Sequence, residues 1–226
     1  MNIHRFSLAG ERLEARPTRT LWWPNARLLA VADLHLGKSE RMARRGGAML
    51  PPYETLDTLA RLRAEIEALS PDHVIALGDS FDDTAAARAL PADVVATLTD
   101  MVAGQRWTWI TGNHDPGRVD LPGDLAADIQ AGPLTFRHIA DPKAGPGELS
   151  GHYHPKARLP HGSRPCFLID SHRAILPAFG TYTGGLDACA PPLLDLMGAD
   201  AQAVLTGSQT LTVRLFAPEA KPARHG

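Results

Sequence analysis

The feature that most constrains the fold is a short apolar run that ends in a glycine and an acid. His73–Leu77 contains Val74 and Ile75, and Gly78 and Asp79 follow it directly. The pattern predicts a buried strand, with a sharp turn at Gly78 that leaves the Asp79 carboxylate at the carboxyl end of the strand. In open α/β sheets this end of the strands forms the crevice where ligands bind. The sequence therefore predicts an α/β fold with a site organised around Asp79.

Three other segments place polar side chains of the same kind directly after apolar runs. They are Asp33-Leu34-His35, Gly112-Asn113-His114-Asp115 and Gly151-His152-Tyr153-His154. On a β-like exit from a strand, residues two apart point to the same side, so Asp33 and His35 are expected to hold one metal ion together. His152 and His154 repeat this spacing. One such pair is common in exposed turns, but four converging segments predict a metal site in which Asp79 bridges two ions.

The periodicity of the first half predicts strands that alternate with helices after an initial β-hairpin that turns at Gly10. Strands are expected at 27–32, 73–77 and 106–111, and a short helix or turn at 38–45. Two amphipathic helices are expected to bury Leu56, Leu59, Leu62, Ile66 and Leu69 in the first, and Val94, Val95, Leu98, Met101 and Val102 in the second. This alternation favours a parallel sheet with helices on its faces.

The second half predicts a second sheet, mixed or antiparallel, because short strand-like runs follow one another with little helical periodicity. These runs are Leu134–Arg137, Phe167–Asp170, Ala174–Leu176 and Leu211–Phe216. No composition break marks a domain boundary, so one domain is expected over residues 1–217. The remaining tail, 218–226, has the composition of a disordered segment.

Composition sets limits on partners and compartment. The chain has 226 residues with 23 basic and 25 acidic side chains, a formal net charge of −2, so any nucleic-acid contact must come from a local patch. Cys166 and Cys189 form no disulfide framework, the N-terminus lacks a signal-peptide core, and no run reaches membrane-spanning length. We expect a cytoplasmic protein without a membrane partner.

The order of the polar motifs resembles the signature of the calcineurin-like metallophosphoesterase superfamily, over about Ala32 to Pro155. This resemblance implies a four-layer αββα sandwich, in which two mixed β-sheets are flanked by helices. It also implies two ligand sets. One ion would be bound by Asp33, His35, Asp79 and His154, and the second by Asp79, Asn113, His138 and His152.

The same resemblance implies a mechanism. Two divalent ions would polarise the phosphoryl oxygens and generate a hydroxide that attacks phosphorus. His114 would assist the leaving group, with Asp33 as its orienting partner. On family grounds the expected ion is Mn²⁺, and Fe or Zn²⁺ also suit the mixed oxygen and nitrogen ligands.

Three segments carry a narrower resemblance, to the ligase-associated DNA damage response endonuclease family (PdeM). They are Asp33–Lys38, Gly151–Pro155 and Leu176–Gly185. This resemblance implies an Mn²⁺-dependent endonuclease for single-stranded or hairpin-loop DNA that acts in DNA repair, in functional association with a DNA ligase and a helicase. Related double-strand-break nucleases often carry His where this chain has Asp82, so Asp82 is expected to orient a ligand or a metal-bound water.

Four basic residues follow the first ligand pair, and they are candidates for contacts with substrate phosphates: Lys38, Arg41, Arg44 and Arg45. On a helix the three arginines would share one face. The alternative is an ordinary solvated helix face. The four tryptophans lie in apolar or strand-like runs and are expected in the core.

The metal motifs leave the substrate open. A dimetal phosphatase or phosphodiesterase for a nucleotide or another small phosphoester would use the same ligands as a DNA endonuclease. A pseudo-enzyme that uses the fold to bind partner proteins predicts missing ligands, whereas every ligand position assigned here is filled.

Overall fold

The structure is a computed structural model that describes residues 2–47, 51, 53–114 and 121–215. The strands of the first sheet are β1 (His4–Leu8), β2 (Glu11–Ala15), β3 (Leu21–Trp23), β4 (Leu28–Val31), β5 (His73–Leu77), β6 (Arg106–Ile110) and β7 (Asp124–Ala126). Those of the second are β8 (Asp128–Ala131), β9 (Leu134–Arg137), β10 (Glu148–Ser150), β11 (Lys156–Leu159), β12 (Gly162–Ile169), β13 (Arg173–Ile175), β14 (Gln202–Leu205) and β15 (Leu211–Arg214). Asp115, Phe216 and the predicted tail lie outside the described residues.

The first sheet follows chain order, β1-β2-β3-β4-β5-β6-β7. The predicted hairpin is confirmed, since β1 and β2 pair antiparallel. Strands β4, β5, β6 and β7 pair parallel with one another, as the alternation of strands and helices predicts, whereas β3 and β4 pair antiparallel. The carboxyl ends of β4, β5 and β6 therefore meet at one edge, and each delivers one of the polar segments.

Helices α1 (Lys38–Arg44), α2 (Glu54–Leu69), α3 (Thr84–Arg88) and α4 (Ala92–Ala103) lie in the first half, α5 (Pro191–Leu194) lies in the second, and a 3₁₀ turn, η1, spans Pro24–Ala26. The prediction of which residues form the buried face of α2 is partly wrong. Leu59 and Leu62 are fully buried, but Leu56 is 50% exposed. The buried face is rotated toward Glu65, because that carboxylate accepts hydrogen bonds from the β2–β3 connection.

The second sheet is mixed, with the order β15-β14-β12-β13-β10-β9-β8 and β11 paired to β12. Strands β9, β10 and β13 pair parallel, and the remaining pairs are antiparallel. The four predicted strands of this half are present. β7, β8, β11 and β14 and the short helices α3 and α5 had no strong apolar pattern and were not predicted.

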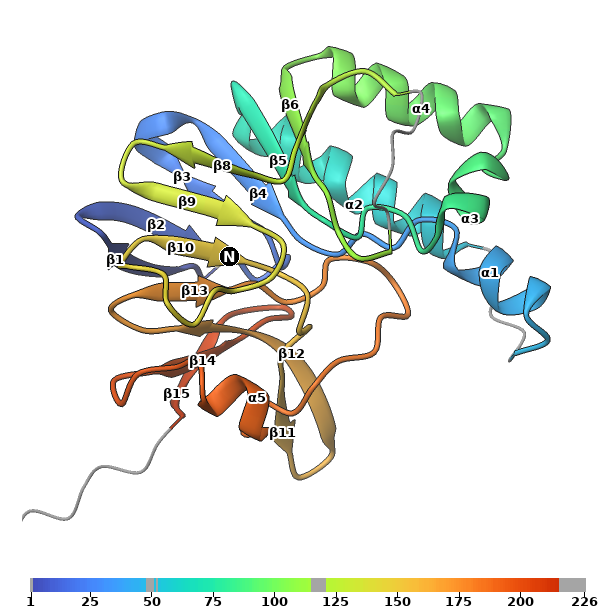
Figure 1. Cartoon of the computed structure of the whole chain (residues 1–226). Coiled ribbons are helices and arrows are strands. Elements are labelled where there is room, and N and C mark those ends of the chain that lie inside the picture. Colours follow the sequence, from blue (N-terminus) through green and yellow to red (C-terminus); the bar gives the residue numbers. More distant parts are fainter. Residues whose placement is uncertain (1, 48–50, 52, 115–120, 216–226) are drawn as a thin grey trace, which may run out of the picture.

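Three buried clusters make this arrangement a four-layer αββα sandwich, as predicted (Figure 1). The central cluster joins the inner faces of both sheets, with Leu13 and Ile75 from one and Phe136 and Phe167 from the other. A second cluster packs α2 and α4 on the outer face of the first sheet. The third packs α5 and its flanking turns on the second sheet. All four tryptophans are buried, which confirms their predicted place in the core.

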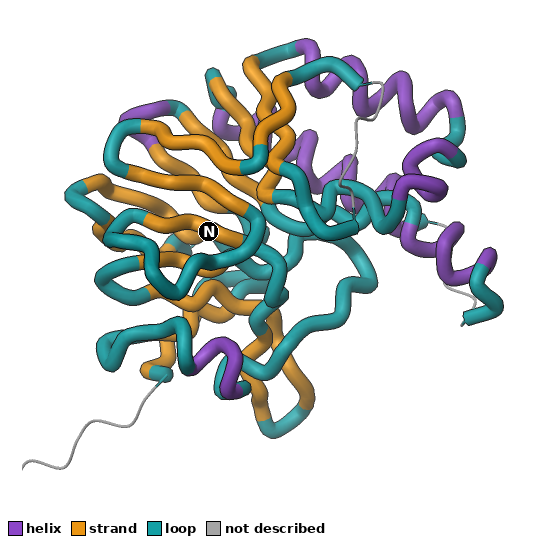
Figure 2. The backbone as a smooth tube through the Cα atoms, viewed as in Figure 1, coloured by secondary structure: helices purple, strands orange, loops and turns teal. Residues whose placement is uncertain are grey.

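A loop follows the carboxyl end of each parallel strand in both sheets (Figure 2). The Gly151 amide donates to the His138 carbonyl, and the Phe179 amide donates to the Ala32 carbonyl. The first bond ties the loop after β10 to the loop after β9, and the second ties the loop after β13 to the loop after β4. Among the described residues, no helix is both long enough and apolar enough to cross a membrane.

Candidate metal centre

Two buried carboxylates, Asp33 and Asp79, lie at the middle of the gathered loops. Each has one oxygen held by a backbone amide: the His152 amide donates to Asp33 Oδ2 at 2.9 Å, and the His114 amide donates to Asp79 Oδ1 at 2.8 Å. The other oxygen of each carboxylate faces histidine nitrogens. These amides fix the orientation of both carboxylates and leave one oxygen of each directed into the centre.

The predicted ligands come together in two groups. In the first, His154 Nε2 lies 3.3 Å from Asp33 Oδ1 and 3.3 Å from His35 Nε2. In the second, Asn113 and His152 lie next to His138. Asp79 Oδ2 faces both groups, since it lies 4.0 Å from His35 Nε2 and 3.4 Å from His138 Nε2. Asp79 therefore lies close to both groups, and its predicted role as a bridging ligand stays a prediction.

His138 brings the second group together. Its Nε2 atom lies 2.9 Å from Asn113 Oδ1 and 3.2 Å from His152 Nδ1. The opposite ring nitrogen, Nδ1, lies 2.9 Å from the Leu77 carbonyl oxygen, so as an N–H it donates there. That bond leaves the Nε2 lone pair directed at Asn113, His152 and Asp79.

The donor set fits divalent metal ions. Asp33, His35 and His154 form one candidate ion-binding group, and Asp79, His138 and His152 form another. Asp33 Oδ1 is buried without a hydrogen bond in the described part of the chain. In each group two histidine nitrogens lie only 3.2 or 3.3 Å apart, and all the possible ligand atoms of a group lie within 4.8 Å of one another, close enough to share one cation. Mixed carboxylate, imidazole and amide ligands favour transition metals over Ca²⁺.

The backbone at the site is strained, and here one geometric expectation is wrong. Asp33 (φ 54°), His35 (φ 46°), Asp79 (φ 46°), His152 (φ 71°) and His154 (φ 48°) all have left-handed backbone conformations. The β-like exits expected after the strands are therefore absent at Asp33 and His152. Such conformations cost on the order of 1–3 kcal/mol each in non-glycine residues and cluster at functional sites. The side chains converge because tight turns, not extended strands, present them.

Glycines make room for this convergence. A Cβ on Gly78 (φ 77°) would overlap with the His138 ring, and one on Gly151 would lie 2.7 Å from Asp33 Oδ2. A Cβ on Gly180 would overlap with the Leu34 carbonyl. The last contact gives the Leu176–Gly185 segment a structural role, because it packs directly against the loop that carries Asp33 and His35.

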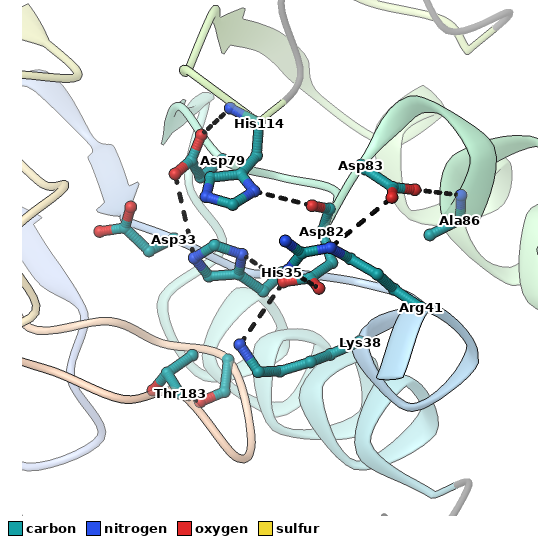
Figure 3. A network of polar contacts seen from close by, with 12 residues as sticks. Asp33, His35, Lys38, Arg41, Asp79, Asp82, Asp83, Ala86, His114 and Thr183 are labelled. Atoms are coloured by element: carbon teal, nitrogen blue, oxygen red, sulfur yellow. Dashed lines mark hydrogen bonds and ion pairs between the residues drawn. The ribbon is translucent and has the colours of Figure 1, made fainter. Parts of the chain in front are cut away.

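Asp82 links the centre to helix α1, as Figure 3 shows. Its carboxylate lies 2.8 Å from His35 Nδ1, which leaves His35 Nε2 directed at the first group. It also pairs with Arg41 at 2.8 Å and with Lys38 at 3.5 Å. Burial would raise the pKa of Asp82, but the bonds from His35 and Arg41 hold it well below its ordinary value. This geometry agrees with the expectation that Asp82 orients a ligand.

The basic cluster forms ion pairs with acidic residues. Arg44 is bonded to Asp83 at 2.8 Å, and Arg41 and Arg45 lie 3.6 and 3.7 Å from the same carboxylate. The three arginines do share one face. Asp83 also caps α3 through the Ala86 amide, and its role as their partner was not predicted, although it directly follows Asp82 in the sequence. The predicted contacts of this cluster with substrate remain a prediction.

His114 lies against the loop that carries Asp82. Its Nδ1 atom is 2.9 Å from the Asp82 carbonyl oxygen, and its ring packs edge-on to His35 with the ring centroids 5.3 Å apart. Asp33 was the expected orienting partner, but the described polar contacts of His114 are with Asp79 and Asp82. As an N–H, Nδ1 donates to this carbonyl, and this contact does not engage Nε2.

Burial and neighbouring charges shift the pKa values of three side chains in the centre. Burial would raise the pKa of Asp79, but the hydrogen bond and charge of His138 and the His114 amide lower it to about 2. Burial would lower the pKa of His138, but Asp79 and Asp33 outweigh this and raise it. Burial and the His138 charge lower the pKa of His152. The two carboxylates therefore favour the protonated form of His138.

Comparison with known proteins agrees with this geometry. The family model "Calcineurin-like phosphoesterase" matches residues 26–177, which include every candidate metal ligand. The chain belongs to the calcineurin-like phosphoesterase family. As a member of this family it is a metal-dependent phosphoesterase. No curated protein matches the chain.

Among solved structures, the chain is similar to Pseudomonas putida nuclease MPE, with 28% sequence identity and a TM-score of 0.75, over 94% of this chain and 100% of that chain. This similarity is consistent with the narrower resemblance to PdeM-type nucleases. Yfce, a phosphoesterase from E. coli, overlaps less closely, with 12% identity and a TM-score of 0.39 over 84% of this chain and 99% of that chain.

Proposed function

We propose that this calcineurin-like phosphoesterase is an Mn²⁺-dependent DNA endonuclease that cleaves phosphodiesters in single-stranded or looped DNA during repair. The observation that carries the proposal is the convergence of two ligand groups on Asp79, in a chain that is similar over nearly its full length to a nuclease. Asp33, His35, Asp79 and His154 would hold one ion. Asp79, Asn113, His138 and His152 would hold the second.

The bound ions would polarise the phosphoryl group and activate the attacking water. The residues around them have separate tasks. Asp82 holds the His35 ring through Nδ1, and the Leu77 carbonyl holds His138 in the same way. Such partners fix the tautomer and the direction of a ligating nitrogen. The ligands therefore need little rearrangement when the ions bind.

His114 is placed to assist the leaving group. The Asp82 carbonyl accepts from Nδ1–H, so the doubly protonated ring would transfer its Nε2 proton to the departing oxygen of the phosphodiester. The amide of the same residue fixes Asp79. His114 thus couples the orientation of the bridging carboxylate to the position of the general acid. Asp33 would bind the first metal ion, and it would orient His114 only indirectly, through that ion.

The proposed setting is the cytoplasm, where the enzyme would act together with a DNA ligase and a helicase. Support for this setting comes from the PdeM resemblance and from the two free cysteines, of which Cys166 is buried and Cys189 is exposed. A phosphatase or phosphodiesterase for a nucleotide or other small phosphoester is the second candidate, because the metal ligands serve both substrates equally well.

Hydrolysis of three substrates in parallel tests the proposal: bis-p-nitrophenyl phosphate, p-nitrophenyl phosphate and a hairpin-loop DNA, each with and without Mn²⁺. We expect Mn²⁺-dependent hydrolysis of the diester and nicking in the DNA loop, with little turnover of the monoester. An Asp79→Asn variant should be inactive on all three. Turnover of the small esters with intact DNA would contradict the nuclease proposal and favour the second candidate.

A further inference from the structure

A pocket beside the metal centre is lined by side chains that the proposed reaction does not use. It measures about 690 Å³, within the range of pockets that bind nucleotide-sized ligands. It lies between the β2–β3 connection, helix α2 and the segment after β13. The lining residues used in the argument are Arg16, Arg19, Asp57, Arg61, Lys156 and Tyr182.

Two of the basic residues in the pocket are already neutralised. Arg16 Nε donates to Glu65 Oε2 at 2.6 Å, and both side chains are buried. Arg61 Nε donates to Asp57 Oδ2 at 3.0 Å, one turn away on α2. These pairs build the wall of the pocket and leave no net charge there.

The other two basic residues, Arg19 and Lys156, form no ion pair with a carboxylate in the described part of the chain. Arg19 Nη1 donates weakly to the Ala178 carbonyl at 3.4 Å, and Lys156 Nζ donates to the Thr183 carbonyl at 3.0 Å. Burial and the nearby Arg61 charge lower the pKa of Arg19. Both partly buried cations donate their hydrogen bonds to carbonyls, and the Asp57 carboxylate acts on Arg19 only through its charge, so a bound anion would stabilise both.

The aromatic ring of Tyr182 also lines the pocket. Tyr182 is 43% exposed and has a left-handed backbone conformation with φ 61°. Its neighbour Thr181 is fixed by Thr58, whose Oγ1 accepts from the Thr181 amide at 3.1 Å, and by Asp57. The chain therefore holds a strained residue in place and keeps its ring accessible, an arrangement that suits contact with a flat ligand.

The pocket adjoins the first ligand group through the backbone. At one end of the segment the Gly180 amide donates to the Asp33 carbonyl at 3.1 Å. At the other, a Cβ on Gly185 would overlap with the His154 carbonyl. Lys156 follows His154 by two residues. The segment that lines the pocket therefore packs directly against the loops that carry Asp33 and His154.

We propose that Arg19, Lys156 and Tyr182 form a subsite for the nucleotide that flanks the scissile phosphate in single-stranded DNA. The cations would bind the flanking phosphate and the tyrosine ring would stack on the base. This inference rests on the proposed function. It supplies a reason for a preference for single strands, because a base paired and stacked within a duplex cannot stack on Tyr182.

Inhibition of bis-p-nitrophenyl phosphate hydrolysis by a twelve-residue oligothymidylate tests the subsite, with the Mn²⁺-loaded enzyme. Its Ki reports binding whether or not the DNA is cleaved. Relative to the KM of the small diester, Ki should rise roughly tenfold in Tyr182→Ala and return to near the wild-type value in Tyr182→Phe, since base stacking on an aromatic side chain is typically worth this much. Arg19→Gln should also weaken inhibition and lower its salt dependence by about one phosphate contact.

Arg158→Gln is the matched control, because Arg158 is an exposed cation outside the pocket, paired with Asp187 at 3.0 Å. It should leave the Ki unchanged. A Ki that also stays at the wild-type value in both Tyr182→Ala and Arg19→Gln would overturn the subsite, even if DNA is cleaved. Inhibition that weakens in these variants while DNA stays intact would support the subsite and refute the endonuclease proposal.

Discussion

Replacing Asp82 by Asn is the most informative change outside the proposed ligands. Asp82 is fully buried, and its carboxylate lies 2.8 Å from His35 Nδ1, on the ring edge opposite the metal-facing nitrogen. The substitution keeps the shape of the side chain but removes the charge that makes the imidazole a stronger donor. We expect Mn²⁺ to bind, but more weakly, because His35 loses its charged partner.

The size of the effect follows from this contact. Loss of a partner behind a metal-ligating histidine costs roughly 10- to 100-fold in metal affinity, or about 1.4–2.8 kcal/mol. A short bond to a carboxylate with no exposure belongs in the upper half of that range. Arg41 and Lys38 also lose their shared partner, so the free energy of unfolding should fall as well.

Titration of hydrolytic activity against Mn²⁺ separates these effects. The variant should need about 30–100 times more Mn²⁺ for half-maximal activity and should recover most of the wild-type kcat at saturation. Asp83→Asn is the matched control, since Asp83 caps α3 and pairs with Arg44, and Asn also caps helices. An Asp82→Asn enzyme with an Mn²⁺ requirement within twofold of wild type would refute the reasoning.

Three further predictions follow from the same geometry. His114→Ala should keep its full metal content while kcat falls roughly 10²–10⁴-fold, as measured by metal analysis and diester hydrolysis; loss of metal as well would make His114 a structural residue. Because the pKa of His138 is raised and a ligand must be neutral, Mn²⁺ affinity should weaken as pH falls through that pKa, and calorimetric titrations should show a proton released on binding. In the metal-free protein the pH dependence has the opposite direction. Protonated His138 contributes to the free energy of unfolding, fully below its ordinary pKa of about 6.5, and this contribution is lost as pH rises through the raised pKa of the folded state. Gly180→Ala should destabilise the protein by about 1–3 kcal/mol in thermal or denaturant unfolding because its Cβ meets the Leu34 carbonyl, whereas Gly184→Ala, with open space around it, should change stability little.

Much of the first sheet was predictable because its central strands are apolar runs bounded by turn residues. In His73–Leu77 four apolar residues follow the histidine and a glycine ends the run, and β5 spans the same residues in the structure. The ligand motifs come directly after such strands, so their meeting at one edge follows from parallel pairing. The short strands β7 and β11 have exposed or half-buried residues. Their pairing depends on neighbours distant in sequence, so the local sequence does not predict it.

Two features of the site were beyond the reach of local patterns. The left-handed conformations at Asp33 and His35 accompany hydrogen bonds between loops, in which the Asp33 amide donates to the Gly78 carbonyl at 3.3 Å and the His35 amide donates to the Asp79 carbonyl at 2.9 Å. The buried position of Glu65 depends on Arg16, 49 residues away in the chain. In both cases tertiary contacts outweigh the preference of the local sequence, as expected where a fold is shaped around a site.

The central claim is that one chain holds two metal ions joined by Asp79. Equilibrium dialysis against Mn²⁺, followed by elemental analysis of the protein, measures this directly. The geometry predicts two ions per wild-type chain and a clear loss of bound metal in Asp79→Asn, because Asp79 Oδ2 faces both ligand groups. A wild-type protein that hydrolyses phosphodiesters at full rate with a single bound ion, or an Asp79→Asn variant that still binds two, would contradict the claim.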